Sequence, residues 1–91
     1  MSPGQGSLRI SDHVQYTKVE GDYVLLDLGS GEYFGLDEVA SLAWEVLAAG
    51  GDQDAAVAAI VRDYAVEPDR AAADVARLLD TLRDKGLIEG G

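Results

Sequence analysis

Few ionisable side chains in this sequence have a spacing suited to chemistry. Asp80 and Asp84 stand four residues apart on a predicted helix, so their carboxylates share one face. Two carboxylates can act as acid and base when their surroundings separate their pKa values, but this pair lacks the apolar surroundings that would do so. His13 is the only histidine and cysteine is absent, so the sequence has no ligand set typical of zinc. We therefore expect no catalytic residue, no metal site and no cofactor.

Two short motifs are similar to sites that carry a covalently attached group. Ser41-Leu42 is similar to the phosphopantetheine site of acyl carrier proteins, but there an Asp precedes the serine at the start of a helix. Here Ala40 precedes Ser41, which lies one turn inside a predicted helix, so we expect a solvent-facing serine. Gly90-Gly91 is similar to the tail of ubiquitin-like sulfur carriers, but a helix leads toward it, so we expect a flexible tail. An acidic carrier protein is one alternative for the function.

The charge of the chain disfavours nucleic acid as a partner. Its 17 acidic and 7 basic residues give a net charge of −10, which repels a phosphate backbone unless a basic stripe overrides it. The arginines are dispersed along the sequence, and those on the last predicted helix are interleaved with aspartates. We expect no nucleic-acid partner, and DNA binding is kept only as a second alternative for the function.

Length and composition indicate a single domain with one modest core. No apolar run approaches the roughly 20 residues of a membrane-spanning helix, and the N-terminus lacks the pattern of a signal peptide. The absence of cysteine fits a reducing compartment. We therefore expect a cytoplasmic protein without a membrane partner.

The first half of the domain reads as strands followed by a helix. Residues 1–12 are rich in Gly, Ser and Pro and are expected to form a flexible N-terminal segment, so the domain spans 13–89. Apolar and β-branched runs at 14–20, 23–28 and 32–36, separated by Gly-containing turns, predict a three-stranded antiparallel sheet. Asp37 followed by apolar residues of 3.6-residue period predicts a capped helix ending at Gly50-Gly51.

Two more helices are predicted after this point. One begins near Asp52 and carries Val57, Ile60 and Tyr64 on one stripe. The other begins at Pro68 and continues to residue 85 before Gly86 ends it. The fold class is therefore α+β, with a three-stranded antiparallel sheet followed by three helices.

The last helix has a wider apolar face than one core contact requires. One stripe comprises Ala71, Val75, Leu78 and Leu82, and a second comprises Ala72, Ala76 and Leu79, flanked by Arg83. The second stripe could pack against the first helix. Alternatively, its alanines and Leu79 could form the floor of a groove beside the third strand.

The third strand lacks the usual protection of a sheet edge. Exposed edges are normally guarded by lysine, proline or an inward charge, because their unpaired N–H and C=O groups recruit other strands. The segment Tyr33-Phe34-Gly35-Leu36 contains no guarding residue, and only Glu32 at its start could act as one. Either the fold covers this edge, or the edge is open for a peptide to add as a further strand.

The order of these patterns resembles a known family, the PqqD-like recognition elements of ribosomally synthesised and post-translationally modified peptides (RiPPs). The stand-alone lasso-peptide leader-binding proteins resemble the chain most. The resemblance covers about Val14 to Ile88. It rests on the segments Val-Leu-Leu-Asp-Leu (24–28), Gly-Glu-Tyr-Phe-Gly-Leu-Asp (31–37), Ala-Trp-Glu-Val-Leu (43–47) and Leu-Leu-Asp-Thr-Leu-Arg-Asp-Lys-Gly-Leu-Ile (78–88).

The resemblance implies a winged helix-turn-helix without catalytic activity. It implies that the leader segment of a ribosomally synthesised precursor peptide binds as an added strand, and that the precursor then passes to a partner leader peptidase, a cysteine protease. It places the peptide-binding residues on the third strand and the last helix, at Glu32, Tyr33, Phe34, Gly35, Leu36, Ala72, Val75, Ala76, Leu79 and Arg83.

Overall fold

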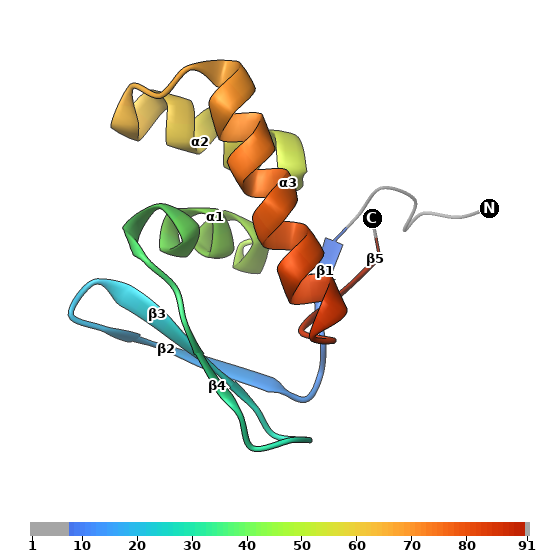
Figure 1. The fold of residues 1–91 in the computed structure, drawn as a ribbon. Helices are drawn as coiled ribbons and strands as arrows, with labels where there is room; N and C mark the ends of the chain where they lie inside the picture. Colours follow the sequence, from blue (N-terminus) through green and yellow to red (C-terminus); the bar gives the residue numbers. More distant parts are fainter. Residues whose placement is uncertain (1–7, 91) are drawn as a thin grey trace.

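The computed structural model describes residues 8–90 as two small sheets and three helices (Figure 1). In chain order the elements are β1 (Leu8–Ile10), β2 (Val14–Val19), β3 (Asp22–Asp27), β4 (Tyr33–Gly35), α1 (Glu38–Ala48), α2 (Gln53–Tyr64), α3 (Pro68–Asp84) and β5 (Ile88–Gly90). The predicted α+β class, with a three-stranded antiparallel sheet followed by three helices, is confirmed.

The larger sheet has the strand order β2-β3-β4, with β4 at one edge. Its strands are antiparallel, and Leu25 at the centre lies opposite Tyr16 on β2 and Phe34 on β4. Leu25 is fully buried because the three helices lie on its side of the sheet (Figure 1). Since side chains alternate along a strand, Val24 and Leu26 project from the opposite face, and both lie outside the core cluster.

The helices begin where the sequence predicts. The side chain of Asp37 accepts a hydrogen bond from the N–H of Ala40 (2.8 Å), and that of Asp52 accepts one from Ala55 (2.9 Å). Each carboxylate thereby satisfies a backbone donor that has no partner inside its helix. Pro68 occupies the first turn of α3, where its missing N–H is not needed.

One expectation about the N-terminus is wrong. Residues 8–10 form β1, which pairs with β5 in a second, two-stranded antiparallel sheet. Ser11 extends this attachment, since its hydroxyl donates to the C=O of Gly86 (2.9 Å) and its N–H to the C=O of Leu87 (3.0 Å). The expected flexible segment therefore does not include residues 8–11, and residues 1–7 and Gly91 lie outside the described chain.

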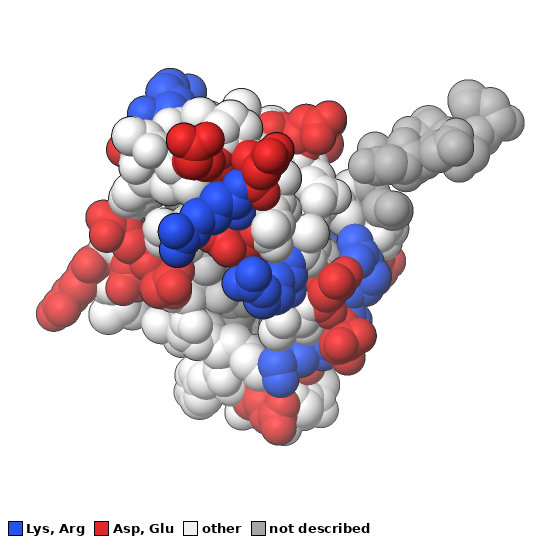
Figure 2. Space-filling view, turned by 45° about the horizontal axis from the view of Figure 1, so that its top comes forward, with Lys and Arg blue, Asp and Glu red and all other residues white. Residues whose placement is uncertain are grey.

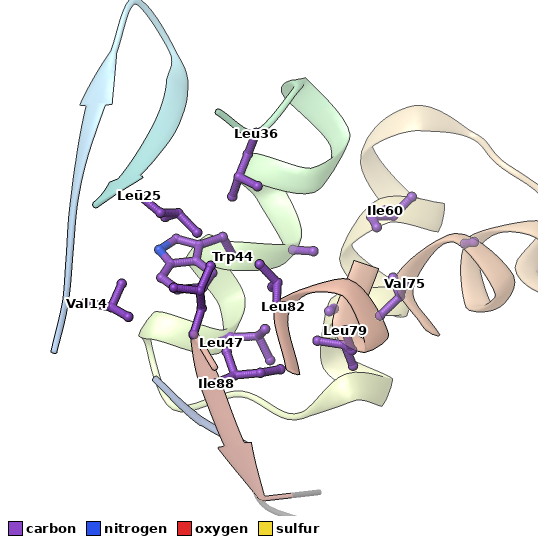
Figure 3. Packing of buried hydrophobic residues seen from close by; sticks show 14 residues of the cluster. Val14, Leu25, Leu36, Trp44, Leu47, Ile60, Val75, Leu79, Leu82 and Ile88 are labelled. Atoms are coloured by element: carbon purple, nitrogen blue, oxygen red, sulfur yellow. The ribbon is translucent and has the colours of Figure 1, made fainter. Parts of the chain in front are cut away.

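Trp44 of α1 occupies the centre of the hydrophobic core and is fully buried. Figure 3 shows its ring between Val14 and Leu25 of the sheet and Leu82 of α3. Tyr16 meets it edge to face, with 5.3 Å between the ring centroids. The core therefore joins the sheet to all three helices and fixes α3 relative to β4.

Candidate functional site

A groove of about 510 Å³ lies between β4 and α3. The N-terminal half of α1 and one side chain of α2 close its base. Its apolar lining residues are Phe34, Leu36, Val39, Ala40, Ala43, Ile60, Val75, Leu78 and Leu82, and the others are Gly35, Asp37, Asp74, Arg77, Thr81 and Lys85. The groove thus has an apolar interior with charged side chains along α3.

Among residues 8–90, no strand pairs with the outer edge of β4, which runs along this groove. The N–H of Asp27 donates to the C=O of Glu32, and the N–H of Leu36 donates to the C=O of Tyr23, both at 2.9 Å. In an antiparallel ladder with this register, Phe34 directs its N–H and C=O toward β3, and its two neighbours direct theirs away. The N–H and C=O groups of Tyr33 and Gly35 therefore point to the free edge.

Lys85 spans the groove from the end of α3 to β4. Its Nζ lies 4.6 Å from the centroid of the Phe34 ring, within the range of a cation–π contact. Five of the seven basic side chains lie within 4.0 Å of a carboxylate, among them Arg77 beside Asp74 at 3.3 Å. Within residues 8–90, Lys85 is one of the two basic side chains without such a partner, so its charge is available to a ligand.

The structure corrects which face of α3 lines the groove. Leu79, predicted for the groove floor, is 1% exposed and belongs to the core, whereas Leu78, predicted for the core, lines the groove. Neither Ala72 nor Ala76 lines it. Arg83 also lies off the groove, with its guanidinium 3.3 Å from the carboxylate of Asp80.

The remaining predicted residues are on or beside the groove. Phe34, Gly35, Leu36 and Val75 line it. Tyr33 is 72% exposed on the outer side of β4, and Glu32 is exposed just before that strand. Four polar residues that line the groove from α3 were not predicted as site residues: Asp74, Arg77, Thr81 and Lys85. The last three stand four residues apart on one helix face, and this spacing was the available signal.

Ser41 is a structural residue rather than a solvent-facing one, contrary to expectation. It is 4% exposed, accepts a hydrogen bond from the N–H of Tyr23 (2.9 Å) and donates one to the C=O of Leu36 (3.3 Å). A serine that carries a phosphopantetheine arm must be accessible to a transferase. This burial therefore argues against the carrier-protein alternative.

The turn after β3 is held by the buried carboxylate of Asp27. Burial alone would raise the pKa of Asp27, but the backbone N–H groups of Gly29 (2.8 Å) and Ser30 (3.3 Å), with smaller contributions from the Ser30 hydroxyl and His13, outweigh it and lower the pKa. The ionised carboxylate thus fixes the turn that leads into β4.

The charged surface is mixed in sign. Figure 2 shows Lys and Arg side chains beside Asp and Glu on the face drawn, without a continuous basic area there. In the part of the chain that the structure describes, no group of three or more His, Asp or Glu side chains could hold a metal ion, and no helix is long and apolar enough to cross a membrane.

Comparisons with known proteins give a consistent result. The model of the family described as coenzyme PQQ synthesis protein D (PqqD) matches residues 22–88. The solved structure of TbiB1 in complex with the TbiA(beta) leader peptide is 37% identical, with a TM-score of 0.87, and the match covers 91% of this chain and 96% of that one. A lasso peptide synthetase B1 complexed with the leader peptide is 28% identical, with a TM-score of 0.82, and the match covers 90% of this chain and 96% of that one. No curated protein sequence matches significantly.

Proposed function

The chain belongs to the PqqD family as a PqqD-like RiPP recognition element, and we propose that it binds the leader segment of a lasso-type precursor peptide. In this proposal the leader adds as a strand to the free edge of β4 and inserts alternate side chains into the groove beside α3. The observation that carries the proposal is the open edge at Tyr33 and Gly35 directly beside an apolar groove.

The groove fits the inward side chains of such a strand. Leucine-sized residues of the leader would contact Phe34, Leu78 and Leu82 and exchange water for an apolar lining, which stabilises binding by about 25 cal/mol per Å² of apolar surface buried. Backbone pairing with β4 gives attraction that is independent of sequence. The choice among leaders therefore depends on side chains.

We extend the proposal to the partner and the mode of action. The chain would act without catalysing a reaction and would present the bound precursor to a leader peptidase of the cysteine protease class. Both carboxylates that line the groove have structural partners, since Asp37 caps α1 and Asp74 is paired with Arg77, which supports a binding role. Two expectations from the sequence remain predictions. One is that the sheet and the three helices form a winged helix-turn-helix, and the other is that the protein is cytoplasmic.

Isothermal calorimetry tests the proposal. The ligand is a synthetic peptide of about 20 residues from the leader of the precursor encoded beside this chain's gene, here called the neighbouring leader. We expect a nanomolar to low micromolar Kd, and binding at least about tenfold weaker for a scrambled peptide of the same composition. Equal binding of the two peptides, or no binding of the neighbouring leader, would contradict the proposed function.

A further inference from the structure

The outer face of the larger sheet carries apolar side chains up to the open edge. Leu26 lies opposite Tyr33 in the ladder, and Val24 lies opposite Gly35. All four positions project away from the helices, because Leu25 and Phe34 between them face the core. Val24 and Leu26 are only half-buried, and Tyr33 is 72% exposed. The apolar outer face is therefore continuous with the edge of β4.

Neither the backbone conformation nor the surroundings of Gly35 explain why a glycine occupies this position. Its φ is not among the positive values of the chain, and a Cβ built on it would meet no atom within 4 Å. Glycine weakens a strand, and a glycine without a conformational reason often marks the close approach of a ligand or another backbone. Its missing side chain leaves open space on the outer face, beside Val24 across the ladder and the exposed Tyr33 two residues before it; we call this space the notch.

A peptide strand added to β4 would use both faces of the extended sheet. Successive side chains alternate, so half enter the groove and half lie on the outer face. The peptide residue opposite Gly35 would have its Cβ about 5 Å from the place where a Cβ of residue 35 would stand, so its side chain could reach the notch. Because Gly35 has no side chain, the side chain of this peptide residue could extend across β4 toward Val24.

We propose that this notch is a second subsite for the leader, in which an outward apolar side chain packs over Gly35 against Val24 and Tyr33. The inference rests on the proposed function and adds a specificity element to it. The groove contacts the inward side chains of the leader, and the notch contacts one outward side chain. A leader that carries a charged residue at this outward position would be rejected, since the charge would lose water to an apolar surface.

The Gly35→Val variant tests the subsite in the full chain. Its side chain fills the notch but leaves the N–H and C=O of the edge in place, so strand addition itself remains possible. We expect about tenfold weaker calorimetric binding of the neighbouring leader, with an unchanged or higher melting temperature, because valine favours a strand. Thr17→Val is the matched control, since Thr17 lies on the same face in the same cross-strand row, on the far edge strand β2. It should bind within about twofold of wild type.

A scan of the peptide identifies the residue concerned. Replacing the leader residues one at a time by alanine should reveal one position whose truncation weakens binding to the wild type but not to Gly35→Val, because the notch is already filled. Tyr33→Ser, at an exposed position, gives a second variant that removes one wall of the notch and should weaken binding several-fold.

The outcomes separate the two proposals. If the wild type does not bind the neighbouring leader, the proposed function fails. If the wild type binds but Gly35→Val binds within about twofold of it, or no leader position shows the coupling, the subsite alone is wrong. If sedimentation shows that wild type is a dimer and Gly35→Val a monomer, a second copy of the chain occupies the notch and the subsite is also wrong.

Discussion

Lys85 combines two properties that suit recognition. Its ammonium group lies over the ring of Phe34 inside the groove, and no carboxylate of the described chain lies within 4.0 Å of it. The other charged side chains of α3 that line the groove, Asp74 and Arg77, form an ion pair with each other. Lys85 is thus better placed than Arg83, which was predicted as a peptide-binding residue, to form a charge-assisted hydrogen bond with a bound peptide.

The first prediction concerns this charge. Lys85→Glu should weaken binding of the neighbouring leader by about tenfold, because a charge-assisted hydrogen bond is lost and a carboxylate enters the groove. Arg70→Glu is the matched control, since it changes the net charge equally at an exposed site of α3 outside the groove. Calorimetry of both variants checks the prediction, and equal losses would assign the effect to net charge alone.

The second prediction concerns pH. The pKa of Asp27 is lowered in the folded state, so its ionised form stabilises the fold above the ordinary carboxylate pKa, and this contribution is lost as the pH falls through the lowered value. Asp27→Asn should therefore be less stable than wild type at pH about 7, and the difference should shrink as the pH drops below about 4. Urea denaturation followed by the fluorescence of Trp44 measures both; a difference that stays constant across this range would contradict the assignment.

At the scale of elements, the sequence predicted what each segment is more readily than which way it faces. Capping carboxylates, Pro68 and the glycines after α1 and α3 are local signals, and they placed the helices within about a residue. Leu78 and Leu79 are adjacent apolar residues, and periodicity alone does not say which of two neighbouring stripes meets the core. That choice depends on how α1 and α2 place α3 in the fold.

Prediction of the strands from the sequence has the same limit, because local signals do not show pairing between distant segments. The open edge of β4 was predictable because the third strand carries so few guarding residues. β1 was missed because three residues in a Gly, Ser and Pro context give too short a signal, and their partner β5 lies at the other end of the chain.

The third prediction tests the corrected face of α3. Thr81→Arg should block the groove by bulk and charge and weaken leader binding by at least about tenfold, at little cost in stability because Thr81 is exposed. Ala72→Arg is the control, because Ala72 lies nine residues away, about two and a half turns, and so on the opposite side of the helix. If Ala72→Arg blocks binding and Thr81→Arg does not, the face predicted from the sequence is the correct one.

At the scale of the whole molecule, the two sheets have different roles. The larger sheet presents the open edge and the groove, and the β1–β5 sheet joins the beginning of the described chain to its end (Figure 1). Leu8 and Ile10 pack against the core from β1, whereas no residue of β1 or β5 lines the groove. The smaller sheet should therefore contribute stability and not leader affinity.

The fourth prediction separates these roles by truncation. Removing residues 1–10 should lower the melting temperature by about 5 °C or more, because the pairing with β5 and the packing of Leu8 and Ile10 are lost. Removing residues 1–7 keeps β1 and serves as the control. The leader Kd should change by less than about threefold in both proteins at a temperature where they are folded. A large loss of affinity only on removal of β1 would show that β1 takes part in binding.

Hydrogen exchange of the β4 amides tests the central claim most directly. The N–H groups of Tyr33 and Gly35 point to the free edge, whereas that of Phe34 already bonds to β3 and serves as an internal control. Saturating neighbouring leader should slow exchange at Tyr33 and Gly35 by at least about tenfold and change Phe34 less, and the scrambled peptide should leave all three rates unchanged. Unchanged rates at Tyr33 and Gly35 with the leader bound, or new protection along β2 instead, would contradict strand addition at β4.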